Sequence, residues 1–240
     1  MVDLKAKSKR HLVINGLIFL ILLFKLSHLI NFRHWYLADT SSKYKRPKLT
    51  ILIEVDKKQL SLIDRENEQV IKSYVIATGK PDSPTPLGTF KIIEKAKWGE
   101  GFGTRWLGLN VPWGIYGIHG TNQPYSIGGN VSAGCVRMCN SDVEDLYERV
   151  AIDTPVVIIN GDFGPFGQGF RTLKPGDRGA DVLEVQKRLS RLGFYTSSLD
   201  GIYGEGMKQA LIDFLKSRNI PLADKIDERI YRELGIILMD

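Results

Sequence analysis

The chain has 240 residues, of which 43% are hydrophobic and 25% are charged. This balance is typical of globular proteins and excludes a disordered or collagen-like chain. The length has room for one or two domains beside any targeting segment. The formal net charge of +6 suits an anionic polymer or surface without identifying one. We expect no nucleic-acid partner, because the sequence contains neither a basic helix nor zinc-finger spacing.

The N-terminal region combines a basic stretch with a long apolar run. Residues 12–30 are mostly apolar and follow four basic residues between positions 5 and 10. About twenty apolar residues are enough to cross a bilayer, so we expect a transmembrane helix. The interpretation is an uncleaved signal anchor over residues 1–35, with the N-terminus in the cytoplasm and the rest outside. Basic residues between 33 and 48 weaken the positive-inside argument, and a cleaved signal peptide is the alternative. Both readings export the folded part.

Residues 48–160 have the pattern of a mainly β domain. Short runs rich in β-branched residues cover 49–55, 59–63, 70–78, 88–93 and 154–159, with turn residues between them. A stretch rich in tryptophan and glycine spans 98–116. We expect most of its rings to pack in the core, with one or two lining a groove near His119. A capping box over 141–144 and apolar positions between 143 and 150 predict a helix.

Two glycine-rich segments carry the residues with chemistry. The first is Gly117-Ile118-His119-Gly120-Thr121, and the second is Ser132-Ala133-Gly134-Cys135-Val136-Arg137-Met138. A cysteine thiol needs a nearby base to act as a nucleophile at neutral pH. The other three histidines lie in or beside the N-terminal apolar run, so a histidine that activates Cys135 must be His119. The only other cysteine is Cys139, and we expect it to be a buried small residue. These counts indicate no disulfide framework, no metal site and no cofactor.

The region at residues 48–160 resembles an L,D-transpeptidase catalytic domain, the cysteine class that acts on bacterial peptidoglycan. The resemblance rests on three motifs in order, at residues 77–90, 118–121 and 132–138. It implies that Cys135 attacks the carbonyl between the third and fourth residues of a stem peptide and releases D-alanine. A thioester remains, and the amine of a second stem's diamino acid takes the acyl group. The product is a cross-link between the third residues of two stems.

The resemblance and the chemistry give each motif residue a role. We expect His119 to accept the thiol proton and the backbone carbonyl near Gly120 to orient it. Gly134 lets the backbone approach the substrate, and N–H groups around Gly134 and Cys135 are candidates for an oxyanion hole. Arg137 either holds a substrate carboxylate or carbonyl or forms a structural salt bridge. Ser132 either contacts the substrate or stabilises the turn, and we favour the structural role in the turn. Many family members have histidine at position 133, so Ala133 excludes a two-histidine mechanism here.

The C-terminal part has the pattern of a small three-helix domain over residues 172–237, after a Gly-rich linker at 161–171. The segments Leu173-x-x-Gly176-Asp177-x-Gly179 and Asp200-Gly201-x-Tyr203-Gly204 resemble the peptidoglycan-binding domain found beside many wall hydrolases. Met207 and Leu215 depart from the family pattern, which often has threonine and glutamine there. A structural or interaction module is the alternative, in which Asp177, Gln186, Asp200 and Tyr203 serve as caps and turns.

These observations predict a membrane-anchored L,D-transpeptidase with a mainly β catalytic domain and an all-α domain. Its expected partners are the stem peptides and glycan of peptidoglycan, on the outer side of the cell membrane. One alternative keeps the thioester but uses water as acceptor, which makes the protein an L,D-carboxypeptidase or endopeptidase. Another is a non-catalytic wall-binding protein with a degenerate active site.

Overall fold

The computed structural model describes residues 48–238, which lie within one compact unit of the chain. The predicted transmembrane segment at residues 12–30 lies outside the described residues. Between residues 48 and 238, no helix combines the length and the apolar character needed to cross a bilayer.

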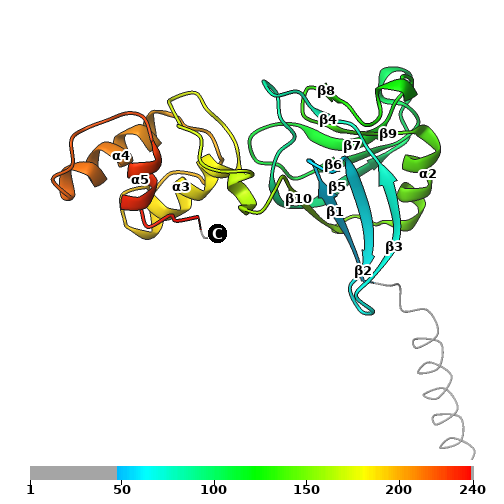
Figure 1. The fold of residues 1–240 in the computed structure, drawn as a ribbon, viewed down its shortest axis with the longest axis horizontal. Helices are drawn as coiled ribbons and strands as arrows, with labels where there is room; N and C mark the ends of the chain where they lie inside the picture. Colours follow the sequence, from blue (N-terminus) through cyan, green and yellow to red (C-terminus); the bar gives the residue numbers. More distant parts are fainter. Residues whose placement is uncertain (1–47, 239–240) are drawn as a thin grey trace, which may run out of the picture. The chain divides into compact units, whose positions relative to one another are not determined.

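The first domain is built on a mixed sheet of eight strands (Figure 1). The strand order is β3-β2-β1-β10-β5-β6-β7-β9, and a separate pair joins β4 to β8. The pairs β1–β10 and β7–β9 are parallel, and the other neighbours in the large sheet are antiparallel. The strands are β1 (Leu49–Glu54), β2 (Gln59–Asp64), β3 (Gln69–Val75), β4 (Thr78–Gly79), β5 (Gly88–Ala96), β6 (Trp106–Leu109), β7 (Tyr116–Gly120), β8 (Asn130–Ser132), β9 (Val136–Met138) and β10 (Pro155–Ile159). The mainly β catalytic domain expected from the sequence is confirmed.

The strands that the sequence pattern missed are those of the Trp- and Gly-rich region. β6, β7, β8 and β9 are only three to five residues long, and β6 and β7 contain glycine, so they show little of the alternation that marks a strand. The predicted strand at 70–78 is divided in two, because the amides of Ile76 and Ala77 leave the β2 ladder. They donate instead to the carbonyls of Lys58 and Arg137.

Helix α2 (Asn140–Arg149) follows β9 and buries Val143 and Leu146 against the sheet. The helix begins at Asn140 with Cys139 as N-cap residue, and no side chain caps it. The predicted capping box at Ser141 was therefore wrong. The helix starts before that serine, so the serine lies inside the first turn rather than at the cap.

The C-terminal domain contains the three predicted helices, α3 (Ala180–Arg191), α4 (Glu205–Ser217) and α5 (Glu228–Glu233). Its core includes the fully buried Gln186, whose amide donates to the Tyr195 hydroxyl, Asp200 Oδ1 and the Ile202 carbonyl. A buried side-chain amide with these partners holds the fold together rather than facing a ligand. Met207 and Leu215 are also buried there, so their departure from the family pattern serves packing.

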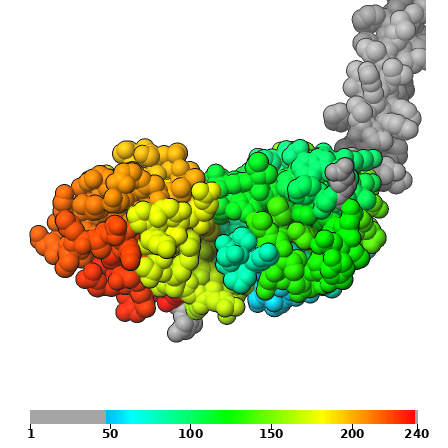
Figure 2. All heavy atoms as spheres, turned by 90° about the horizontal axis from the view of Figure 1, so that it is seen from above, coloured from blue at the N-terminus to red at the C-terminus, as the bar shows by residue number. Residues whose placement is uncertain are grey.

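The Gly-rich segment before this domain is packed rather than free. It contains the 3-10 helix η3 (Gly164–Phe166), and the ring of Phe170 stacks on Tyr231 with centroids 4.3 Å apart. Phe166 meets the same tyrosine edge-on at 5.7 Å. In Figure 2 the yellow part of the chain, which includes α3, lies between the green residues of the first domain and the orange and red helices. The phenylalanines fix the segment to the helical core.

Candidate active site

Strands β7 and β9 bring the two motifs that carry the candidate catalytic residues side by side. The two strands are parallel, and His119 is the register partner of Arg137. Ile118 and Val136, also register partners, are buried in the core on the opposite face. Cys135 comes directly before β9, at the end of the turn that contains Gly134, and the backbone amide of Gly117 on β7 interacts with its thiol. The register therefore joins two sequence motifs that lie sixteen residues apart.

The imidazole of His119 is buried and oriented by the backbone. Its side chain is 3% exposed, and Nδ1 lies 2.6 Å from the carbonyl oxygen of Gly120. A carbonyl oxygen only accepts, so we assign the ring proton to Nδ1 and the lone pair to Nε2. This is the contact expected from the family resemblance. It fixes the tautomer that a general base toward a thiol needs.

Aromatic rings lie around His119, and one of them, Trp106, is its register partner on β6. Phe102 meets the imidazole edge-on with centroids 5.1 Å apart, and Trp106 lies at 6.1 Å. Trp98 stacks on Trp106 at 4.7 Å. These rings come from β6 and from the 3-10 helix η1 (Glu100–Phe102) with the loops around it. They exclude water from the imidazole, and this burial changes its pKa.

Burial changes the pKa of both members of the pair. It lowers the pKa of His119 below its usual range, the carbonyls of Gly120 and Phe102 oppose this, and Arg137 lowers it further. Burial raises the pKa of the Cys135 thiol, against which the Gly117 amide and the Arg137 charge favour the thiolate. Both dominant effects penalise charge. Burial therefore favours the neutral thiol and the neutral imidazole over a preformed thiolate–imidazolium pair.

A tight turn carries the thiol. Gly134 has φ of +114°, and its amide donates to Ser132 Oγ at 3.0 Å. The Ser132 hydroxyl in turn donates to the Cys135 carbonyl at 2.6 Å. With its hydroxyl used twice and its side chain buried, Ser132 stabilises the turn, so its predicted contact with substrate is not favoured. The Gly134 amide, predicted as an oxyanion-hole donor, is already engaged. The Cys135 amide is then the remaining candidate of the two.

Arg137 is held by its backbone and leaves its charge at the site. Its amide and carbonyl pair with those of Ala77, both at 2.9 Å. Its Nε is buried without a hydrogen-bond partner, and no carboxylate between residues 48 and 238 forms an ion pair with it. The structural salt bridge considered from the sequence is thus not formed. An unpaired buried donor near Cys135 fits a role toward substrate.

Asn140 supports the site and was missed from the sequence. Its Oδ1 accepts from the Thr104 amide at 3.3 Å and packs against the Cα atoms of Gly103 and Gly120. A side chain at either glycine would overlap this oxygen. The residue thus joins the loop that carries Phe102 to the backbone that orients His119. An asparagine at a helix start is common, so no sequence signal identified it.

The other titratable groups do not extend the site. Cys135 and Cys139 are both free thiols, and Cys139 occupies the N-cap position of α2. Across residues 48–238, no group of three or more histidine, cysteine or acidic side chains could hold a metal ion.

Comparison with known proteins agrees with this geometry. Residues 50–158 match the family model described as "L,D-transpeptidase catalytic domain", and residues 178–226 match the model described as "Putative peptidoglycan binding domain". The Bacillus subtilis protein named "Putative L,D-transpeptidase YkuD" is 45% identical over 109 residues, which cover 45% of this chain and 64% of that protein. "Putative L,D-transpeptidase YqjB" of the same organism is 39% identical over 113 residues, or 40% of this chain and 62% of that protein.

The NMR structure of the catalytic domain of an E. faecium L,D-transpeptidase has 23% identity and a TM-score of 0.40, over 46% of this chain and 96% of that one. The chain spans less than two thirds of the length of the two B. subtilis relatives. Two parts of the chain are thus each similar to a known domain family: residues 50–158 to the L,D-transpeptidase catalytic domain, and residues 178–226 to the peptidoglycan-binding domain.

Proposed function

We propose that the protein is a cysteine L,D-transpeptidase that cross-links peptidoglycan through a thioester on Cys135. The observation that carries the proposal is the register of β7 and β9, which pairs His119 with Arg137, two residues after Cys135. The hydrogen bond from His119 Nδ1 to the Gly120 carbonyl leaves Nε2 ready to accept a proton. An oriented imidazole within reach of a thiol is the arrangement that nucleophilic catalysis by cysteine requires.

Acylation begins with attack of Cys135 Sγ on the carbonyl carbon between the third and fourth stem residues. The thiol proton passes to Nε2 of His119, and the carbonyl oxygen gains the negative charge. The C–N bond then breaks, His119 returns its proton to the amine of the departing D-alanine, and a thioester remains. The carbonyls of Gly120 and Phe102 favour the protonated imidazole that exists between these two steps.

Deacylation uses the same groups in the reverse sense. The side-chain amine of a second stem attacks the thioester carbonyl, His119 accepts a proton from that amine, and the C–S bond breaks. The sulfur takes the proton back, which restores the neutral pair. Arg137 favours the thiolate leaving group through its charge. With its unpartnered Nε it also offers a donor to a substrate carboxylate or carbonyl.

The same proposal places the enzyme at the outer face of the cell membrane. The apolar run at residues 12–30 supports an N-terminal anchor, and peptidoglycan lies outside the membrane that such an anchor would occupy. The domain at residues 178–226 supports retention on the wall polymer, which raises the effective concentration of substrate for the linked catalytic domain.

Intact-mass measurement of the full chain with tetrapeptide stems tests the proposal. We expect a protein adduct equal to the stem minus D-alanine, and a linked dimer of stems as product. Cys135→Ala should form neither, and Cys139→Ala, which removes the other free thiol, should form both. Turnover by Cys135→Ala would refute the thioester route. An adduct that yields only trimmed stems would indicate water as acceptor, and a folded protein that binds wall polymer without an adduct would indicate a binding protein.

A further inference from the structure

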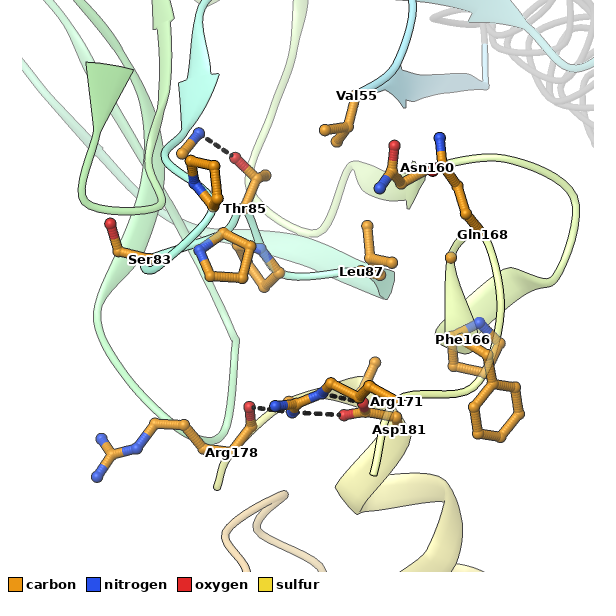
Figure 3. Close-up of a pocket in the computed structure, with 18 of the residues that line it drawn as sticks. Val55, Ser83, Thr85, Leu87, Asn160, Phe166, Gln168, Arg171, Arg178 and Asp181 are labelled. Atoms are coloured by element: carbon orange, nitrogen blue, oxygen red, sulfur yellow. Dashed lines mark hydrogen bonds and ion pairs between the residues drawn. The ribbon is translucent and has the colours of Figure 1, made fainter. Parts of the chain in front are cut away.

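A large cavity lies between the catalytic domain and the start of the helical domain. Its volume is about 1110 Å³, and residues of both domains line it (Figure 3). Thr85, Leu87 and Asn160 come from the catalytic domain, and Phe166 and Arg178 come from the C-terminal part of the chain. This volume exceeds that of a usual small-molecule pocket and has room for several residues of a peptide.

The cavity adjoins the active site without including it. Cys135 and His119 do not line it, but Tyr116 and Ala133 do. Tyr116 begins β7, three residues before His119, and its ring packs on Gly134 so closely that a methyl group there would lie 2.6 Å from Cε1. Ala133 lies two residues before Cys135, and its short side chain leaves this wall open. A substrate bound at Cys135 can therefore continue into the cavity.

The helical domain packs closely against the catalytic domain and forms one wall of the cavity. Gly201 packs directly against the ring of Trp113, so that no side chain larger than hydrogen fits at position 201. Ala180, Leu183 and Ile202 pack against the hydrophobic core of the catalytic domain. An apolar contact with a ring buried in that core fixes the position of the loop at residues 176–179.

The charged side chains that the C-terminal part of the chain contributes to the cavity form ion pairs with one another, except for Arg178. Arg171 Nε and Nη2 hold both carboxylate oxygens of Asp181, at 2.5 and 3.1 Å, and Arg171 Nη1 lies 3.7 Å from Asp177. Arg171 Nη2 also donates to the carbonyl of Arg178 at 3.1 Å, which fixes that backbone. The Arg178 side chain extends away from this pair (Figure 3), is exposed, and forms no ion pair with a carboxylate of residues 48–238. Its charge lowers the pKa of Tyr116, which burial and Cys135 raise.

We infer that this cavity is a subsite for the stem peptide and that Arg178 binds one of the peptide's carboxylates. The inference rests on the proposed function, because it continues the substrate path from Cys135. A guanidinium fixed at its backbone and free at its head matches a carboxylate in shape and charge. The helical domain then contributes to the selectivity of the catalytic domain, in addition to any contact of its own with the wall polymer.

Steady-state acylation by the full chain tests the inference. The substrates are a tetrapeptide stem and forms of it in which each carboxylate in turn is an amide. Arg178→Ala should raise KM for the acidic stem about ten-fold, as the loss of one charged hydrogen bond does, with little change in kcat. For one of the amidated forms, the one without the carboxylate that Arg178 binds, wild type and Arg178→Ala should have the same KM. Arg191→Ala, which removes an exposed arginine of α3 that does not line the cavity, should match wild type.

A binding measurement separates this inference from the proposed function. In the Cys135→Ala background, the Kd for the unreacted acidic stem should rise by the same factor when Arg178 is also replaced. Equal Kd values with and without Arg178 would overturn the subsite, even if wild type forms the thioester. Failure of wild type to form any adduct would instead refute the proposed function, while a Kd that depends on Arg178 would still support the subsite.

Discussion

The turn at Gly134 offers the sharpest test of how the backbone positions the thiol, through the substitution Gly134→Ala. Gly134 has φ of +114°, a region that residues with a Cβ rarely adopt. A methyl group there would also lie 2.6 Å from Tyr116 Cε1 and 3.2 Å from the Pro84 carbonyl oxygen. The substitution therefore combines backbone strain with a steric clash, one residue before the nucleophile.

The two costs can be separated with a matched glycine. Gly128 has φ of +90°, and a methyl group there would meet nothing within 4 Å. Gly128→Ala should therefore show the backbone strain alone, roughly 1–3 kcal/mol of unfolding free energy. Gly134→Ala adds overpacking, typically about 1–3 kcal/mol more. We expect the difference between the two variants to be of that second size.

Denaturant unfolding and the acylation rate give the two readouts. Gly134→Ala should be less stable than Gly128→Ala and should acylate on the order of 100-fold more slowly, because a displacement of about 1 Å at the reacting atom has that effect. Gly128→Ala should retain nearly the wild-type rate. If Gly134→Ala proved as stable as Gly128→Ala and acylated at the wild-type rate, the close packing of Tyr116 on the turn would be refuted.

Three further predictions concern the proton acceptor, its support and one surface-facing carboxylate. The acylation rate should rise with pH through the His119 pKa, and its midpoint should fall below about 6.5, because burial lowers that pKa; a pH–rate profile with a midpoint above 7 would contradict the assignment. Asn140→Ala should lower the unfolding free energy by about 1–2 kcal/mol and reduce kcat more than it changes KM, whereas Asn140→Asp, which keeps the acceptor oxygen for Thr104, should recover most of the rate. The Tyr74 hydroxyl lowers the pKa of Asp145 to about 2, so this carboxylate stabilises the fold above the unfolded-state pKa near 3.9 and loses that contribution as pH falls toward 2. Asp145→Asn should remove about 1 kcal/mol at pH 7 and flatten that dependence in acid unfolding curves, and an unchanged curve would count against it.

The catalytic pair was accessible from the sequence because few residues could supply it. Only one histidine lies outside the N-terminal region, and only two cysteines exist, so Cys135 and His119 followed by elimination and by motif. Strands such as β1 and β2 were also predictable, since each carries several β-branched or apolar residues over six positions. The helices of the C-terminal domain followed from their apolar periodicity.

The supporting residues were not accessible, because their roles depend on partners far away in the sequence. Asn140 acts through Thr104 and Gly103, which lie 36 and 37 positions earlier in the chain. The hydrogen bond from the Gly134 amide to Ser132 Oγ depends on the conformation of the turn, which its local sequence does not specify. The pattern around 141–144 predicted a capping box with Ser141 as N-cap, but the N-cap is Cys139, two residues earlier.

The sequence by itself determined the chemistry of this protein: a thiol, one imidazole, a mainly β domain and a three-helix domain. Residue types and local periodicity carry that information, because they depend on side chains within a few positions of each other. The tertiary structure alone decided that His119 and Arg137 share a register, that burial disfavours charge on both His119 and Cys135, and that Arg178 lines a cavity beside the active site. Strand register and burial depend on packing summed over the whole domain, so no short segment encodes them.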